Sequence, residues 1–265
     1  MTETNVELEF DGAVAVLTLN RPDVLNSMTP ALARDARAAI AQVNETPSAR
    51  ALLITGAGRA FCAGAELKDA FLNGSANQSA GEQLDVTMRD DFNPWVTDLD
   101  QLRIPVIAAV NGVAAGAGVG LALAADITVA ARSASFILSF CPKLGLIPDV
   151  GTTWYLPRRI GLARATALAL LGNRLDAQEA AQWGLIAQCV DDTQLLDTAM
   201  EMARTLARLP TGIALELRRA LKHSQSNSLS AQLDYERERQ CTLIESAAFR
   251  EGVTAFREKR APVFG

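Results

Sequence analysis

One aspartate stands out in this sequence because of its surroundings. Asp149 lies between Pro148 and Val150 at the start of GLIPDVGTTWYLPRRIG, in a loop that is otherwise apolar and contains glycine. A carboxylate in a dry pocket has a raised pKa and can serve as a general acid or base near neutral pH. A solvated turn residue or a helix cap is the simpler alternative. The choice depends on what the rest of the chain places around this residue.

Two loops of small residues could supply backbone N–H donors for an oxygen of the ligand on which such a carboxylate acts. FCAGAEL (61–67) follows a predicted buried strand at 51–55, and NGVAAGAGVGLALAAD (111–126) follows another at 106–110. Glycine and alanine let backbone N–H groups approach a ligand closely. Taken singly, the first loop is more simply explained as a strand-to-helix turn, and the glycines of the second also permit close packing of a helix on a sheet. Together, the two loops can direct two N–H donors at one oxygen, which stabilises an oxyanion in acyl chemistry.

Other common catalytic arrangements fit the sequence poorly. The turn at Gly56 and Gly58 lacks the third glycine of a dinucleotide-binding fingerprint, because that position is Phe61. The only histidine, His223, would have to serve any Ser-His-Asp, Cys-His or His-rich metal site. The four cysteines are far apart and form no CxxC pair. We therefore expect neither a metal site nor a disulfide framework.

Composition limits the class of protein further. Of the 265 residues, 49% are hydrophobic and 21% are charged, as in ordinary globular proteins, and the net charge of −5 disfavours binding to nucleic acid. Residues 106–125 are uncharged and as long as a membrane span, but Asn111-Gly112 and three further glycines favour a strand, a loop and a short helix. The acidic N-terminus has no signal-peptide pattern. We expect a cytoplasmic protein without membrane or nucleic-acid partners.

The predicted elements divide the chain into a mixed α/β core (1–192) and a helical region (193–265). Asp11-Gly12 predicts a hairpin, and Thr29-Pro30 predicts the start of a helix. Residues 68–95 are polar and are predicted to form a mobile segment that could gate a site. Further strands are predicted at 127–131, 136–138 and 186–190, and helices at 116–125, 163–171 and 177–183. From 193 onward the pattern is helical, with Thr211, Ser228 and Ser246 as candidate caps.

The motifs together resemble the crotonase (enoyl-CoA hydratase/isomerase) superfamily, in order and spacing, over nearly the whole chain. They are FCAGAEL, PVIAAVNGVAAGAGVGLALAADITVAA, GLIPDVGTTWYLPRRIG, GNRLDAQEAAQWGLI and EGVTAFREKRAPVF. The resemblance implies a spiral of ββα units with a helical C-terminal trimerisation region, and a homotrimer or hexamer. It implies an acyl-CoA thioester as substrate. Coenzyme A is then part of the substrate, and no permanently bound cofactor is expected.

The resemblance also implies the site residues. The oxyanion donors fall on the backbone N–H groups of Ala65 and Ala117. The family more often has glycine at the second position, but alanine keeps the N–H. Further contacts to the substrate or to coenzyme A are implied for Ala63, Gly64, Gly116, Phe256 and Lys259, the last two often reaching a neighbouring subunit's site.

A count of carboxylates distinguishes the possible reactions. Hydratases of this family use two glutamates, at positions that here correspond to Gly120 and approximately to Cys141-Pro142, and neither offers a carboxylate. Moving a double bond from the 3,4 to the 2,3 position needs one base, and Asp149 is available. The setting resembles the branch of epoxyphenylacetyl-CoA isomerase and Δ3,Δ2-enoyl-CoA isomerases. We therefore predict an isomerase that shifts a double bond, or rearranges a ring epoxide, with Asp149 as acid and base.

Several alternatives stay open on the sequence alone. Hydration could use another acid, and Glu66 lies directly after an oxyanion donor. A dehalogenase of the superfamily uses an aspartate at a similar position as nucleophile, but it also needs a histidine in the segment that here reads DFNPWVTDLDQ. A non-catalytic or RNA-binding relative is a further class. The acyl group stays open too, with a candidate pocket of Phe71, Leu72, Met88, Phe92, Trp95, Phe136, Phe140 and Trp154.

Overall fold

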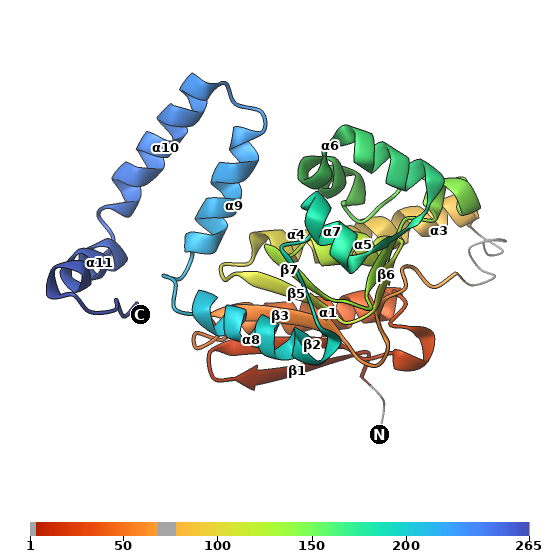
Figure 1. Ribbon diagram of the computed structural model, residues 1–265, viewed down its shortest axis with the longest axis horizontal. Coiled ribbons are helices and arrows are strands. Elements are labelled where there is room, and N and C mark those ends of the chain that lie inside the picture. Colours follow the sequence, from red (N-terminus) through yellow and green to blue (C-terminus); the bar gives the residue numbers. More distant parts are fainter. Residues whose placement is uncertain (1–3, 68–77, 265) are drawn as a thin grey trace.

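The chain forms two β-sheets with helices around them (Figure 1). The computed structural model describes residues 4–67 and 78–264. A six-stranded sheet has the order β1-β2-β3-β5-β7-β10, and a four-stranded sheet has the order β4-β6-β8-β9. The strands are β1 (Val6–Asp11), β2 (Val14–Leu19), β3 (Ala51–Gly56), β4 (Ala60–Cys62), β5 (Val106–Val110), β6 (Val113–Ala115), β7 (Ile127–Ala131), β8 (Ser135–Ile137), β9 (Arg174–Asp176) and β10 (Gln188–Val190).

The central strands of the larger sheet are buried on both faces. Every residue of β3 and of β5 is buried, and the mainly apolar sequences of these strands are typical of the interior of a parallel sheet. β2, β3, β5, β7 and β10 pair in parallel, whereas β1 pairs with β2 as an antiparallel hairpin. Gly12 has a positive φ of 60° in that turn. The predicted hairpin and central strands are confirmed.

A repeated step links the two sheets. β3, β5 and β7 of the larger sheet are followed along the chain by β4, β6 and β8 of the smaller one, and helical segments then lead back to the larger sheet. This arrangement is the predicted spiral of ββα units. It also places the ends of β4 and β6 side by side, because these two strands pair in parallel.

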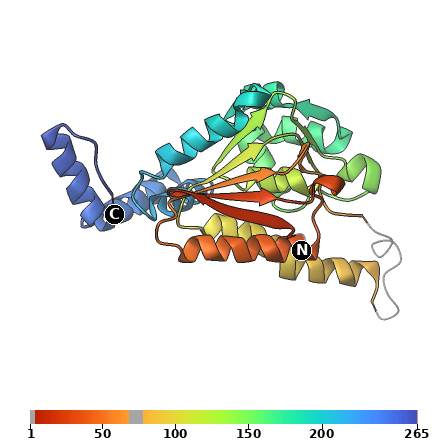
Figure 2. The same ribbon diagram turned by 90° about the horizontal axis from the view of Figure 1, so that it is seen from below.

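Helices cover both faces of the larger sheet. Figure 2 shows α1 and α4 on one face and α8 on the other. Thr29 caps α1 by accepting a hydrogen bond from Leu32 N, as the Thr-Pro pair predicted. The helices are α1 (Pro30–Glu45), α3 (Ala80–Thr87), α4 (Asn93–Gln101), α5 (Ala117–Leu123), α6 (Thr152–Leu171), α7 (Ala177–Trp183), α8 (Leu195–Leu206), α9 (Ile213–Ser224), α10 (Leu229–Leu243) and α11 (Ala247–Glu258).

The segment predicted to be mobile and to gate a site (68–95) is in part helical. Residues 68–77 lie outside the described residues, but residues 80–101 form α3, a π-helical turn (Met88–Phe92) and α4. A capping box starts α3: Ser79 Oγ accepts from Glu82 N, and Ser79 N donates to the Glu82 carboxylate. The polar composition of α3 reflects its exposure, since none of its residues is buried.

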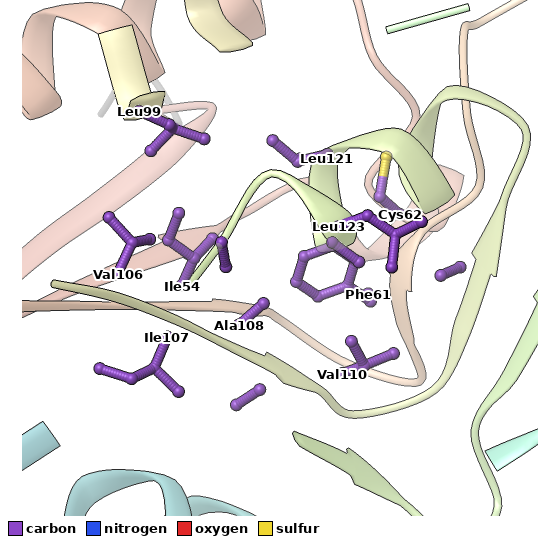
Figure 3. Close-up of a cluster of buried hydrophobic side chains, with 14 of the residues drawn as sticks. Ile54, Phe61, Cys62, Leu99, Val106, Ile107, Ala108, Val110, Leu121 and Leu123 are labelled. Carbon is purple, nitrogen blue, oxygen red and sulfur yellow. The ribbon is translucent and has the colours of Figure 1, made fainter. Parts of the chain in front are cut away.

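Apolar side chains from three directions meet behind the two small-residue loops. Figure 3 shows Phe61 and Cys62 of β4 close to Leu121 and Leu123 of α5, with Ile54 of β3 in the same cluster. All five side chains are at most 1% exposed. Burial raises the pKa of the Cys62 thiol to about 12, so this cysteine is an inert core residue. The cluster fixes β4 and α5 relative to one another.

The last three helices project from the core (Figure 1). Arg218 of α9 holds this region to the core through Asp126 at 2.5 Å and the carbonyl of Ile104 at 2.7 Å. Many large apolar side chains on these helices are exposed, including Leu217, Leu221, Leu229, Leu233, Ile244, Phe249 and Phe256. In the described part of the chain, no helix is both long enough and apolar enough to cross a membrane.

Candidate active site

The two small-residue loops touch through their glycines. Gly64 and Gly116 both have positive φ, at 92° and 53°. A Cβ atom added to Gly64 would lie 2.7 Å from the carbonyl oxygen of Ala115 and 3.3 Å from the backbone nitrogen of Ala117. A side chain at this position would push the loops apart, so glycine is needed here for both the backbone conformation and the close approach. The predicted convergence of Ala63, Gly64, Gly116 and the following alanines is therefore present in the geometry.

Two backbone donors are free where these loops meet. Among the described residues, neither Ala65 N–H nor Ala117 N–H donates a hydrogen bond to the protein. Of the neighbouring groups, Glu66 N donates to Met28 O at 2.9 Å and Gly116 N donates to Ile137 O at 2.9 Å. Ala117 is the first residue of α5, where backbone N–H groups have no partner within the helix, and Ala65 is half-buried, so both donors are available to an acceptor oxygen at the loop contact.

A third segment, residues 21–28, supports the first loop. Met28 N donates to Gly64 O at 2.7 Å, and Ala63 N donates to Leu25 O at 3.0 Å. Arg21 pairs with Glu66 at 3.1 Å, with both side chains about four-fifths buried. The sequence reasoning did not find this support, although Asn26 gave a signal, since asparagine tolerates the left-handed conformation found there (φ 55°). Glu66, the candidate second acid, is therefore engaged in an ion pair with Arg21.

Asp149 has a buried oxygen without a partner. Its Oδ1 atom accepts no hydrogen bond from the residues that the structure describes, although its own backbone N–H donates to the carboxylate. Burial raises the pKa of Asp149 from 3.8 to about 6, and the backbone hydrogen bond opposes that rise. The alternative of a helix cap is wrong, because Gly151 occupies the N-cap of α6 and no side chain caps that helix. Asp149 therefore has the pKa and the free oxygen of a general base.

The backbone after Asp149 is constrained. Val150 and Gly151 both adopt left-handed conformations, with φ of 49° and 76°, and Thr152 N then donates to Asp149 O at 2.9 Å. A β-branched residue in this region is strained, and such strain is concentrated at functional sites. The carbonyl of Val150 faces Gly120 on α5, the helix that begins with Ala117. The loop of Asp149 therefore packs directly on the helix that carries one of the free donors.

The candidate pocket residues separate into different environments. The Phe140 ring lies against the glycine loop, 3.6 Å from a Cβ atom added to Gly116. Trp154 is 38% exposed and stacks with Arg158 at 4.2 Å, so it packs away from the buried cluster. Phe71 and Leu72 lie outside the described residues, Met88 is partly buried, and Phe92, Trp95 and Phe136 belong to the core at no more than 1% exposure.

The two predicted residues of the C-terminal tail do not join the loops within this chain. Phe256 and Lys259 lie on and directly after α11, at the opposite end of the molecule from α5 and α6 (Figure 1). Phe256 is 85% exposed. The residues that the resemblance places at the glutamate positions of hydratases are Gly120, which lies on α5, and approximately Cys141-Pro142, which lie in a π-helical turn (Phe140–Leu144). No group of three or more metal-binding side chains occurs within residues 4–67 and 78–264.

Comparison with known proteins decides the family. Residues 9–265 match the family described as enoyl-CoA hydratase/isomerase. The chain belongs to this family. It is 49% identical over 252 residues to 1,2-epoxyphenylacetyl-CoA isomerase of Escherichia coli, covering 95% of this chain and 94% of that protein.

Solved structures of the enoyl-CoA hydratase/isomerase family have the same fold. An enoyl-CoA hydratase from Bacillus anthracis superposes with a TM-score of 0.88 at 35% identity, covering 98% of each chain. An enoyl-CoA hydratase from Polaromonas sp. JS666 superposes with a TM-score of 0.89 at 32% identity, covering 98% of this chain and 99% of that one. The predicted crotonase fold is confirmed. Similar relatives thus carry both isomerase and hydratase names.

Proposed function

We propose that this enzyme is an acyl-CoA isomerase in which Asp149 is the acid and base. The observation that carries the proposal is the buried, unpartnered oxygen of Asp149 in a loop packed on α5, the helix that begins at one of the two free donors. The name of the Escherichia coli relative supports an isomerase in preference to a hydratase. The absence of a carboxylate at Gly120 and at Cys141-Pro142 supports it independently.

The proposed reaction moves one proton. The substrate is a thioester of coenzyme A with a double bond between C3 and C4. Its carbonyl oxygen accepts hydrogen bonds from Ala65 N–H and Ala117 N–H, which stabilise the enolate formed when Asp149 removes a proton from C2. The protonated Asp149 then returns the proton to C4, and as the enolate reverts to the thioester carbonyl the double bond comes to lie between C2 and C3. Atoms and charge balance without any permanently bound cofactor, because coenzyme A enters as part of the substrate.

The second candidate substrate is a coenzyme A thioester whose acyl group carries a ring epoxide. The 49% identity to 1,2-epoxyphenylacetyl-CoA isomerase favours it, and the same oxyanion donors would hold the thioester of an aromatic acyl group. Phe140 offers an aromatic surface beside Gly116, the residue before the second donor. Both candidates are CoA-thioester isomerisations, so the assay of the wild-type enzyme should include both.

Assays of the wild-type enzyme on two substrates test the proposal against hydration. We expect 3-enoyl-CoA to be converted to 2-enoyl-CoA, which is followed by the absorbance of the conjugated thioester. Hydration of 2-enoyl-CoA is expected to be slower by about a hundredfold to ten-thousandfold, because both hydratase glutamates are absent and Asp149 can supply only one of the two acid–base functions that hydration needs. Hydration that is faster than isomerisation would refute the assignment. In that case Glu66 becomes the next residue to test.

The pH dependence of the rate is a further prediction. The base must be ionised to accept the proton, so kcat/KM for isomerisation is expected to rise with pH through a midpoint of about 6 and to be constant above it. Burial sets this midpoint, and among the described residues no charged side chain contributes to it. The measurement is kcat/KM from pH 4.5 to 8 with a substrate that has no titrating group in that range. A midpoint near 4 would mean that the carboxyl group of Asp149 is exposed to water when it acts, contrary to its buried position in the structure.

The remaining expectations belong to the same proposal. The exposed Phe256 and the apolar faces of α9–α11 support a homotrimer or hexamer in which a neighbour's tail, with Lys259, reaches the coenzyme A of another subunit. Residues 193–265 would then form the assembly region and residues 1–192 the catalytic core. The net charge of −5 supports a protein without a nucleic-acid partner. A cytoplasmic location is proposed because the four cysteines are far apart and show no disulfide pattern.

A further inference from the structure

The contact between α5 and the loop of Asp149 has no room for a side chain. A Cβ atom added to Gly120 would lie 2.3 Å from the carbonyl oxygen of Val150 and 2.8 Å from the hydroxyl oxygen of Thr152. Separations below 3.0 Å are not found for real Cβ atoms, so one of the two segments would have to move. The atom closest to this added Cβ is the backbone carbonyl oxygen of Val150, which cannot rotate away as a side chain can.

Both sides of this contact are otherwise rigid. Gly120 is fully buried in α5, whose residues are all buried in the core. On the other side, Val150 and Gly151 hold left-handed conformations, and Thr152 begins the long helix α6. Thr152 is fully buried, and its hydroxyl has no hydrogen-bond partner within the described part of the chain. The separation between α5 and the loop of Asp149 is therefore set by the contact between the backbone of Gly120 and the backbone carbonyl of Val150.

This separation also fixes the distance between base and oxyanion donors. Ala117 lies at the start of α5, and Gly120 lies one helical turn further on, three residues away. Asp149 is the residue before Val150, whose carbonyl touches Gly120. A displacement of the loop from α5 would carry the carboxylate away from a thioester held at Ala117. Misplacement of a reacting group by about 1 Å can reduce the rate by about a hundredfold.

We infer that Gly120 is a positioning residue for the reaction: its missing side chain lets the loop of Asp149 close onto α5 and so places the base against the bound thioester. The inference rests on the proposed function, because it takes Asp149 as the base. It has a second consequence, since position 120 is where a hydratase of this family would carry a glutamate. In this structure a side chain at 120 would require Val150, and with it Asp149, to move.

The test is the variant Gly120→Ala, which adds one methyl group. We expect kcat for isomerisation to fall by about a hundredfold, while the affinity for a saturated acyl-CoA, measured by calorimetry, stays within about threefold. The pKa of Asp149 should fall from about 6 toward its ordinary range as the loop moves toward water. That pKa is read from the carboxyl resonance of ¹³C-labelled aspartate, assigned by its absence in Asp149→Asn.

Two other glycines provide matched controls. Gly81 lies in the exposed helix α3 and has no close neighbour at its Cβ position, so Gly81→Ala should retain wild-type kcat and the wild-type Asp149 resonance. Gly112→Ala introduces a comparable conflict, 2.1 Å from the carbonyl of Arg59, in the turn between β5 and β6 and not on α5. That variant should be destabilised but should keep the titration midpoint of Asp149. The comparison separates general strain from displacement of the base.

Two outcomes would overturn the inference. A folded Gly120→Ala enzyme with wild-type kcat and an unchanged Asp149 titration would show that the contact does not position the base. Gain of hydratase activity near the isomerase rate in Gly120→Glu would show that both carboxylates fit together. If Gly120→Ala does not fold, Gly120→Ala/Val150→Gly replaces it, since a flexible residue at 150 lets the loop of Asp149 move away from the added methyl group without unfolding the protein. Low kcat with retained acyl-CoA affinity and a lowered Asp149 titration midpoint in that double variant support the inference, and wild-type kcat with an unchanged midpoint refutes it.

The titration also separates this inference from the proposed function. The Asp149 resonance reports the position of the carboxyl group whether or not it is the base. If Asp149→Asn isomerises at the wild-type rate, the proposed function fails, whereas the shifted titration in Gly120→Ala still shows the structural coupling. If Asp149→Asn is inactive but Gly120→Ala leaves rate and titration unchanged, only the positioning inference fails.

Discussion

Replacement of Asp149 by asparagine is expected to reduce kcat for isomerisation by about a thousandfold, within the range of 10² to 10⁴ typical of a general acid–base group. Asparagine is close to aspartate in size, but it cannot accept the proton from C2. The affinity for a saturated acyl-CoA should be nearly unchanged, because the two backbone donors remain. The measurement is kcat on 3-enoyl-CoA together with the dissociation constant of the saturated thioester.

The same variant is expected to be more stable than the wild type at neutral pH. Since the fold raises the pKa of Asp149 from 3.8 to about 6, keeping this group ionised in the folded state costs on the order of 1–3 kcal/mol at pH 7. The cost is fully present above pH 6, falls as the pH drops from about 6 to about 4, and is absent below that. The difference in unfolding free energy between the two proteins should follow this course.

The control for both measurements is Asp176→Asn. Asp176 caps α7 by accepting a hydrogen bond from Glu179 N at 2.7 Å, and asparagine caps helices equally well. This variant should retain wild-type kcat and should show no stabilisation at pH 7. A thousandfold loss in the control would point to a general effect of the substitution. Retention of wild-type kcat in Asp149→Asn would exclude Asp149 as the base.

The residues of the candidate site could be predicted from the sequence more fully than the pairing of the short strands that brings them together. Asp149 was identifiable because a lone acid in an apolar loop is unusual, and the loops at 61–67 and 111–126 because glycine and alanine there follow buried strands. Pairing between β4 and β6, which brings these loops together, was not predicted. Each of these strands has three residues, too few for an alternating pattern to be recognised.

Other features depend on contacts that no local pattern reveals. Ser228 and Ser246 cap α10 and α11 as predicted, but Thr211 does not cap α9, whose N-cap is Gly212 in a left-handed conformation. Gly120 gave no local sign of its role, since a glycine in a predicted helix is usually attributed to close packing of any kind. Its significance comes from the carbonyl of Val150, which is thirty residues away in the sequence.

Removal of the Ala117 N–H alone is expected to reduce kcat by about 10² to 10³, as for other oxyanion donors. Ala117→Pro makes this change, because Ala117 is the first residue of α5 and proline is well tolerated at that position. The residue before it, Gly116, has φ of 53° and ψ of −126°, which lies outside the helical region that proline disfavours in its predecessor. The helix should therefore persist while one donor is lost.

The matched variant for this prediction is Ala80→Pro. Ala80 is the first residue of α3, and Ser79 before it has the extended conformation that proline favours in its neighbour (φ −66°, ψ 162°). The substitution removes an N–H at the start of an exposed helix and should leave kcat unchanged. The Asp149 midpoint in the pH–rate profile should stay at about 6 in both variants, since neither moves the base. If Ala117→Pro folds and isomerises at the wild-type rate, the thioester carbonyl does not depend on this donor, and the oxyanion would have to be stabilised elsewhere.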